Sequence, residues 1–142
     1  MLKILVPVDG SQNAERAVAH TIQFVANSKE PVEIHLLNVQ TPIVSGDVKM
    51  FIKQEDINAY YRDMADKALA TARQALDQAG VRYEHHIGVG QIAETIIDYT
   101  ASKQCGQIVM GSRGLGSMSG LLLGSVATKV IQLAEVPVTL VK

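Results

Sequence analysis

The chain has 142 residues, of which 47% are hydrophobic and 19% are charged, and its formal net charge is −1. This length suits one domain spanning residues 1–142, and the composition is ordinary for a globular protein. The near-neutral charge and the scarcity of aromatic residues (two Phe, four Tyr and no Trp) argue against a nucleic-acid-binding surface and against attraction to an anionic membrane.

The cysteine content and the N-terminus bear on the cellular compartment. Cys105 is the only cysteine, so no disulfide forms within the chain, which favours a reducing environment. Residues 1–7 turn polar too soon for a signal peptide, and no apolar run approaches the ~20 residues that span a bilayer. We therefore expect a cytoplasmic protein with no membrane partner.

The first third of the chain predicts a strand, a helix and a second strand. An apolar run at 2–8 is typical of a buried strand, and Ser11 is a plausible N-cap for a helix that ends near residue 25. A second strand is predicted at 32–39. Residues 41–53 show no clear period and predict a loop.

The rest of the chain continues this alternation. The remaining predicted elements are a helix at 55–79, a strand at 81–87, a turn at 88–90, a helix at 91–103, a strand at 107–110, a helix at 125–134 and a strand at 137–141. Five strands alternating with four helices predict right-handed crossovers, and hence an α/β fold with a doubly wound parallel sheet and helices on both faces.

A glycine-rich stretch between the fourth strand and the last helix is the strongest functional signal. Gly111, Gly114 and Gly124 follow the spacing G-x2-G-x9-G, and Ser125 comes directly after them. Glycines at a strand-to-helix turn let backbone N–H groups approach an anion, and a helix N-terminus adds unpaired donors. The stretch therefore predicts a phosphate-binding loop, although turns that bind nothing remain an alternative.

Two better-known nucleotide motifs are incomplete. Gly116 and Ser117 stand where a Walker A motif beginning at Gly111 would have its second glycine and its lysine, so the phosphate-binding lysine is absent. Gly88 and Gly90 fit a dinucleotide fingerprint, but the strand that follows ends without an acidic residue for a ribose. We interpret residues 88–90 as a tight turn.

Asp9 ends the first strand and is a second candidate for ligand contact. In doubly wound sheets, ligands bind beyond the carboxyl ends of the strands, where the strand order reverses. If the first and fourth strands flank that point, Asp9 and Gly111 face the same crevice. The alternative is that Asp9 only orders the turn before Ser11.

The combination of motifs resembles the universal stress protein family over nearly the whole chain. The matching segments are Ile-Leu-Val-Pro-Val-Asp-Gly-Ser at 4–11, Leu-Leu-Asn-Val at 36–39, Ile-Val-Met-Gly-Ser-Arg-Gly at 108–114, Leu-Gly-Ser-Val at 123–126 and Pro-Val-Thr-Leu-Val at 137–141. The resemblance implies a five-stranded sheet in the order 3-2-1-4-5. Since every fixed position of the glycine motif is present, it also implies the branch of the family that binds ATP.

Carried over by position, the resemblance implies a nucleotide site drawn from several strand ends. The expected site residues are Pro7, Val8, Asp9, Val39, Met110, Gly111, Arg113, Gly114, Gly124, Ser125 and Val126. Asp9 is expected at the adenine and ribose end, with backbone hydrogen bonds from Val39 to the adenine edge. The first two motif glycines and Arg113 would line the ribose and first phosphates, and residues 124–126 would hold the outer phosphates.

The sequence predicts neither a catalytic site nor a metal site made only of protein groups. Adjacent His85 and His86 point to opposite faces of a strand, and His20 and His35 have no Cys or acidic partner at ligand spacing. A Mg²⁺ ion held by ATP phosphates and water is the expected metal. No histidine is placed by sequence to activate a serine near the glycine motif.

These features predict an ATP-binding universal stress protein that acts as a nucleotide-dependent signalling or protective module. Two alternatives stay open: a slow ATPase or nucleotidyl-transfer enzyme, and a nucleotide-free dimerising scaffold. The last strand, 137–141, is short and apolar, and it lies at a sheet edge in the implied strand order. The resemblance and this edge predict a homodimer through that strand.

Overall fold

The structure is a computed structural model that describes residues 1–42, 51–115, 120 and 122–142. Most of the predicted loop at 41–53 lies outside these residues, and so does the incomplete Walker motif at Gly116 and Ser117. None of the helices in the described residues is both long and apolar enough to cross a bilayer.

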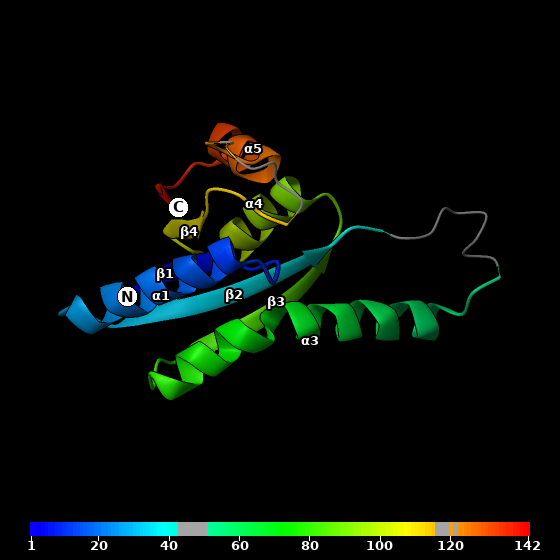
Figure 1. Cartoon of the computed structure of the whole chain (residues 1–142), viewed down its shortest axis with the longest axis horizontal. Coiled ribbons are helices and arrows are strands. Elements are labelled where there is room, and N and C mark those ends of the chain that lie inside the picture. Colours follow the sequence, from blue (N-terminus) through cyan, green and yellow to red (C-terminus); the bar gives the residue numbers. More distant parts are fainter. Residues whose placement is uncertain (43–50, 116–119, 121) are drawn as a thin grey trace.

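The described residues form one parallel sheet with helices on both faces (Figure 1). The strands are β1 (Leu2–Pro7), β2 (Val32–Gln40), β3 (Tyr83–Val89), β4 (Gln107–Gly111) and β5 (Val138–Val141). The helices are α1 (Gln12–Asn27), α3 (Gln54–Gln78), α4 (Ile92–Ser102) and α5 (Ser125–Leu133). The sheet order is β3-β2-β1-β4-β5 with every neighbouring pair parallel, which confirms the predicted topology.

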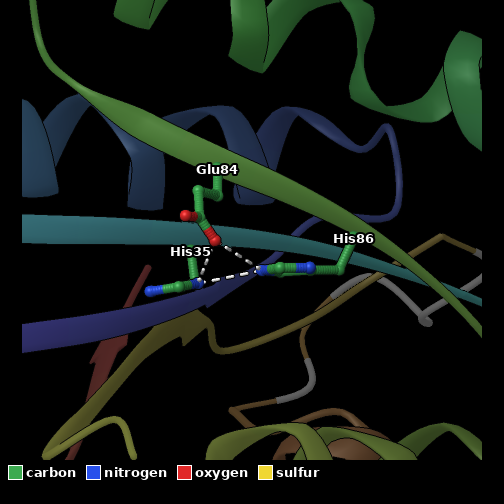
Figure 2. Close-up of side chains that lie close together, drawn as sticks. All are labelled: His35, Glu84 and His86. Carbon is green, nitrogen blue, oxygen red and sulfur yellow. Dashed lines mark hydrogen bonds and ion pairs between the residues drawn. The ribbon is translucent and has the colours of Figure 1, made fainter. Parts of the chain in front are cut away.

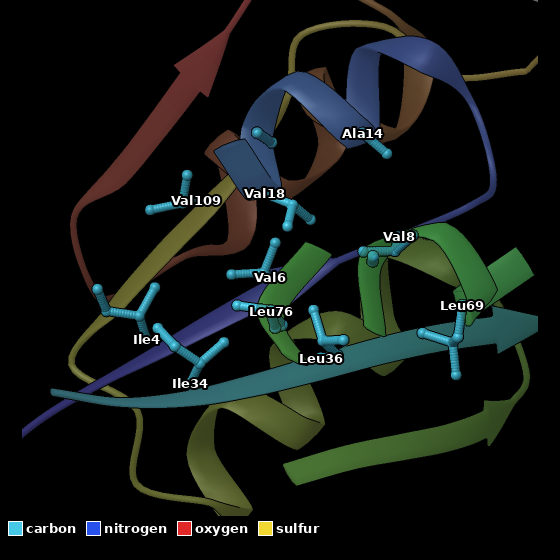
Figure 3. Close-up of a cluster of buried hydrophobic side chains, with 12 residues drawn as sticks. Ile4, Val6, Val8, Ala14, Val18, Ile34, Leu36, Leu69, Leu76 and Val109 are labelled. Carbon is cyan, nitrogen blue, oxygen red and sulfur yellow. The ribbon is translucent and has the colours of Figure 1, made fainter. Parts of the chain in front are cut away.

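One face of the sheet packs against α1 and α3. Ile4 and Val6 of β1, and Val8 directly after it, point to this face, as the two-residue period of a strand requires. Figure 3 shows them meeting Ala14 and Val18 of α1 and Leu69 and Leu76 of α3. This apolar cluster fixes the start of α1 directly above the carboxyl end of β1.

The opposite face packs against α4 and α5. Leu5 and Leu37 point to this side from β1 and β2, and both are fully buried. They pack with Ile96 of α4 and Val130 of α5. Both faces of the central strands are therefore covered, which explains why these strands read as continuous apolar runs in the sequence.

β3 differs from the sequence prediction at both ends: it begins at Tyr83 instead of residue 81, and it ends at Val89 instead of residue 87. The turn predicted at 88–90 is shorter than expected, because Gly88 and Val89 belong to the strand and pair with Val39 and Gln40 of β2. The cause is the length of β2, which runs to Gln40 and offers ladder partners for both residues. Hydrogen bonds between strands far apart in sequence thus override the local turn signal.

Candidate functional site

A cavity of about 360 Å³ opens at the carboxyl ends of β1, β2 and β4. It lies where the strand order reverses between β1 and β4, the usual ligand position in a doubly wound sheet. Its size falls within the range of about 300–1,000 Å³ typical of small-molecule sites. The lining includes all eleven residues predicted from the sequence: Pro7, Val8, Asp9, Val39, Met110, Gly111, Arg113, Gly114, Gly124, Ser125 and Val126.

The remaining lining residues are mostly apolar. They are Ala14, Leu37, Asn38, Gln40, Met64, Ala68, Ile92, Ile96, Leu115 and Ala127. They come from β2 and all four helices, together with the loop after β4. A planar apolar ring of a ligand would find aliphatic contacts here, while polar groups concentrate around Asp9 and the glycine loop.

Asp9 ties the glycine loop to the end of β1. Its Oδ1 accepts a hydrogen bond from the Ser11 N–H at 2.9 Å, and its Oδ2 accepts one from the Leu115 N–H at 3.0 Å. A Cβ at Gly114 would lie 2.5 Å from that same Oδ2, so only glycine allows this approach. Asp9 therefore orders the turn before Ser11, which was the alternative to ligand contact, and it also lines the pocket.

Asn13, which the sequence reasoning missed, holds the other end of the loop. Its Oδ1 accepts a hydrogen bond from the Arg113 N–H at 2.7 Å, and its Nδ2 donates to the Val141 carbonyl at 3.0 Å. The side chain is buried, and a Cβ at Gly111 would collide with its amide. No local pattern marks Asn13, because both partners lie at least 100 residues away in sequence.

A second pair of missed polar residues shapes the β2 side of the pocket. The Asn38 Nδ2 donates to the Val8 carbonyl at 2.8 Å, and the Gln40 Nε2 donates to the Asn38 Oδ1 at 2.6 Å. The first bond links the carboxyl end of β1 to β2, and the second orients the Asn38 amide from within β2. Asn38 is a polar residue within the apolar part of a buried strand, and this was the signal available in the sequence.

The N-terminus of α5 borders the cavity without a side-chain cap. Gly124 is the N-cap, no side chain of the described residues caps the helix, and the first turn holds no acidic residue. The Gly124 N–H itself donates to the Ser112 carbonyl at 2.7 Å. Ser125, the first helical residue, is exposed at the rim. The dipole and the N–H groups of this helix end favour an anion.

Among the described lining residues, Asp9 and Arg113 carry the formal charges, and none is a histidine, cysteine or lysine. This part of the lining therefore offers hydrogen bonds and an electropositive helix end but no paired base and nucleophile. Its chemistry is suited to holding an anionic ligand with an apolar ring.

Comparison with known proteins identifies the relatives of this fold and pocket. The family model described as the universal stress protein family matches residues 1–142. The chain belongs to the universal stress protein family.

Relatives of known sequence and structure extend along nearly the whole of this universal stress protein. It is 30% identical to Universal stress protein MJ0531 of Methanocaldococcus jannaschii over 141 residues, which cover 99% of this chain and 81% of the relative. The solved structure of MJ0577, from the same organism, has a TM-score of 0.84 at 29% identity and covers 99% of this chain and 95% of its own.

A third relative was solved with a nucleotide. The structure of the universal stress protein from Archaeoglobus fulgidus in complex with dAMP has a TM-score of 0.68 at 26% identity. The match covers 100% of this chain and 98% of that one. Nucleotide binding is thus a property of some members with this fold.

Proposed function

We propose that this universal stress protein binds ATP, accompanied by Mg²⁺, in the cavity at the carboxyl ends of β1, β2 and β4. Nucleotide occupancy would make it a stress-response signalling or protective module rather than a metabolic enzyme. The observation that carries the proposal is the convergence of all eleven predicted residues on one cavity beside an uncapped helix N-terminus.

The phosphate end of the site rests on α5 and the glycine loop. Within the described part of the chain, α5 begins without a side-chain cap, and a phosphate group would supply an acceptor for its first-turn N–H groups. Ser125 stands exposed at this rim and offers a hydroxyl to the outer phosphates. Mg²⁺ would be held by phosphate oxygens and water, in keeping with its preference for oxygen ligands.

The adenine end rests on the apolar part of the lining. Val39, Met110 and Ile92 offer aliphatic contacts to a base, and Asp9 offers a carboxylate to a ribose hydroxyl. The dAMP complex of the Archaeoglobus fulgidus relative supports an adenine nucleotide as the class of ligand. The buried free thiol of Cys105 is consistent with a reducing compartment, and we place the protein in the cytoplasm.

The experiment that tests this function has two stages. Freshly purified protein is denatured and the released small molecules are identified by mass spectrometry. Stripped protein is then titrated calorimetrically with ATP, AMP and cyclic AMP in the presence of Mg²⁺. ATP recovered near one per chain, or rebinding at micromolar concentration, is the expected result. No released nucleotide and no heat of binding would favour a nucleotide-free scaffold.

Substitution of Asp9 locates the binding within the chain. Asp9→Ala should weaken ATP about ten- to hundred-fold, because a charge-assisted hydrogen bond contributes about 1.5–3 kcal/mol. Asp98→Ala is the matched control, since it removes the same charge from an exposed position on α4 outside the cavity lining. Equal affinities of the two variants would place ATP elsewhere. Circular dichroism of both variants checks that each is folded, since Asp9→Ala also removes the hydrogen bonds that Asp9 accepts from the Ser11 and Leu115 N–H groups.

We also propose that the protein forms a homodimer through β5. This strand ends the sheet, and its residues Val138–Val141 are all half-buried and uncharged. The other edge strand, β3, carries Glu84, His85 and His86, which protect it against pairing. An uncharged edge favours antiparallel pairing with a second copy about a two-fold axis.

A further inference from the structure

The pairing of β2 with β3 gathers ionisable side chains away from the nucleotide cavity. His35 lies opposite Glu84 in the parallel ladder, and His86 lies two residues further along β3 on the same face. Glu33 precedes His35 by two residues on that face of β2. None of these four residues lines the cavity, and Figure 2 shows the three central side chains pointing toward one another.

The three central side chains present one ligand atom each to a common point. The His35 Nδ1 lies 2.8 Å from the His86 Nε2 and 3.7 Å from the Glu84 Oε2, and the last two atoms are 3.9 Å apart. Ligand atoms around a tetrahedral Zn²⁺ with bonds of about 2.0–2.2 Å lie about 3.3 Å from one another. Shifts of about half an ångström therefore bring all three atoms to bonding distance of one ion.

Glu33 supplies the outer partner that a metal-binding histidine requires. Its Oε1 lies 2.6 Å from the His35 Nε2, and this contact assigns the ring proton to Nε2. The lone pair of Nδ1 is then directed at His86 and Glu84. His35 is only 3% exposed, so the packing around it holds the ring in this orientation.

The surroundings of His86 favour the neutral imidazole, which is the form that binds metals. Burial, followed by the nearby positive charge of Lys103, lowers the pKa of His86 below its ordinary value of 6.5. The Tyr99 ring packs against the imidazole at 5.8 Å between centroids. Lys103 also repels a bound cation, and the carboxylates of Glu33 and Glu84 offset that repulsion.

We propose that His35, Glu84 and His86 form a binding site for a divalent transition-metal ion, with Zn²⁺ as the best match. Two imidazoles and one carboxylate form a donor set that suits Zn²⁺ and disfavours Mg²⁺ and Ca²⁺, which prefer oxygen ligands. Glu84 is 62% exposed, which leaves the fourth position open to water on its side. His86 binds after its ring proton moves from Nε2 to Nδ1. The ion would tie β2 to β3 at the sheet edge remote from β5.

The site departs from the expectation that His35 lacks an acidic partner. The shortest acidic contact of His35 is with Glu33, only two residues away on β2, so alternation along the strand was the signal available for it. Glu84 and His86 lie about 50 positions away along the chain, and only the β2–β3 register brings them to His35. His85 and His86 do point to opposite faces, as expected, because His85 pairs with Leu36. The proposed site uses only His86, so it does not require both histidines on one face.

The test is a calorimetric titration of untagged, chelator-stripped protein with Zn²⁺, performed without nucleotide because ATP itself binds the ion. We expect one Zn²⁺ per chain, and no comparable heat with Mg²⁺. His86→Gln and Glu84→Gln should each weaken Zn²⁺ at least ten-fold, and Glu33→Gln should weaken it about ten- to hundred-fold, as outer-partner substitutions do. His85→Gln, the exposed neighbour on the other face, should bind Zn²⁺ as the parent does.

A second readout guards against unfolded variants. Zn²⁺ should raise the unfolding temperature of the parent and of His85→Gln by mass action, and raise that of His86→Gln by clearly less at the same Zn²⁺ concentration. Far-UV circular dichroism without metal establishes that each variant is folded, and Glu84→Gln alters only an exposed side chain. Failure of Zn²⁺ to bind the parent, or an unchanged Zn²⁺ affinity after substitution of His86 or Glu84, would overturn the proposal and leave a hydrogen-bonded cluster.

Discussion

Two short polar side chains, Asp9 and Asn13, organise the pocket at the scale of single residues. Asp9 accepts from the Leu115 N–H and Asn13 from the Arg113 N–H, so both ends of the loop after β4 are fixed from the β1–α1 turn. Each contact needs a glycine opposite it, at Gly114 and Gly111 respectively. The glycines therefore serve this close packing as well as any ligand.

Substitution of Gly111 tests this packing directly. Gly111→Ala should lower the free energy of unfolding by about 1–3 kcal/mol, because the new Cβ displaces the Asn13 amide from its buried hydrogen bonds. Gly106→Ala is the control, since its Cβ would meet Leu2 at an ordinary 3.7 Å. Chemical denaturation measures both, and the control should change by less than about 0.5 kcal/mol. A Gly111→Ala variant as stable as the control would contradict the role of Asn13.

The Cys105 thiol makes stability depend on alkaline pH. Burial raises its pKa to about 11 from an ordinary value of 9.0, so the unfolded chain loses this proton at lower pH than the folded protein. The free energy of unfolding should fall as pH rises from 9 towards 11. Cys105→Ala should remove this part of the fall, as measured by denaturant titrations across that range. Parallel pH profiles for the two proteins would show that the thiol contributes nothing.

At the scale of elements, the N-termini of α1 and α5 both lie beside the cavity but are capped differently. The Ser11 side chain caps α1 by accepting from the Ala14 N–H at 3.1 Å, and Glu15 lies in its first turn. The N-terminus of α5 has neither feature. α3 and α4 also begin without a side-chain cap, but each has an acidic residue in its first turn, so among the helices of the described residues only α5 lacks both. A helix gains from a cap and an early acid, so this double omission is consistent with a helix end reserved for an anion.

A carboxylate placed at the start of α5 should separate stability from ligand binding. Ser125→Asp should stabilise the protein by about 0.3–1 kcal/mol through the helix dipole, yet weaken ATP at least ten-fold by occupying the phosphate position. ATP should lose more affinity than AMP, because residue 125 is assigned to the outer phosphates. Calorimetry with both nucleotides and thermal unfolding measure these effects.

The matched control for this change is Gln12→Asp, at the first residue of α1 and outside the cavity lining. It adds the same charge at the same helical position and should leave ATP affinity unchanged. Unaltered ATP binding by Ser125→Asp would mean that the outer phosphates do not lie at α5.

At the scale of the whole molecule, the sheet separates two apolar cores and leaves two edges. The core under α1 and α3 positions the β1–α1 turn (Figures 1 and 3). The core under α4 and α5 positions the N-terminus of α5. The cavity lies at the carboxyl ends of the strands between these cores. The β3 edge carries Glu84 and His86 of the proposed metal site, whereas the residues of β5 are uncharged.

The β5 edge predicts how the chain assembles. Sedimentation velocity over a concentration series should show a dimer at micromolar protein, with monomer appearing on dilution. Amide hydrogen exchange in residues 138–141 should slow as the dimer forms, while exchange in β3 stays constant. A monomer at every concentration would refute the β5 interface.

Local patterns in the sequence predicted the order and type of the strands and helices, and they marked the glycine motif, Ser125 and Asp9 as candidates for ligand contact. The two-residue and helical periods place the strands and helices, and the glycine spacing with Asp9 marks residues that all line one cavity. These signals are readable because each arises from neighbours in the chain: a turn, a cap, a buried strand end. The resemblance to the family then supplied the strand order, which the structure confirms.

The register between strands was decided by the tertiary structure alone. It extends β3 to Val89 and sets His35 beside His86, while the packing of α1 against the sheet brings Asn13 to the glycine loop. Each of these contacts joins residues about 50 to 100 positions apart, and no local period encodes which of them meet. Ladder hydrogen bonds and the packing of two cores select one register, because a shift by one residue would turn every buried side chain to the wrong face.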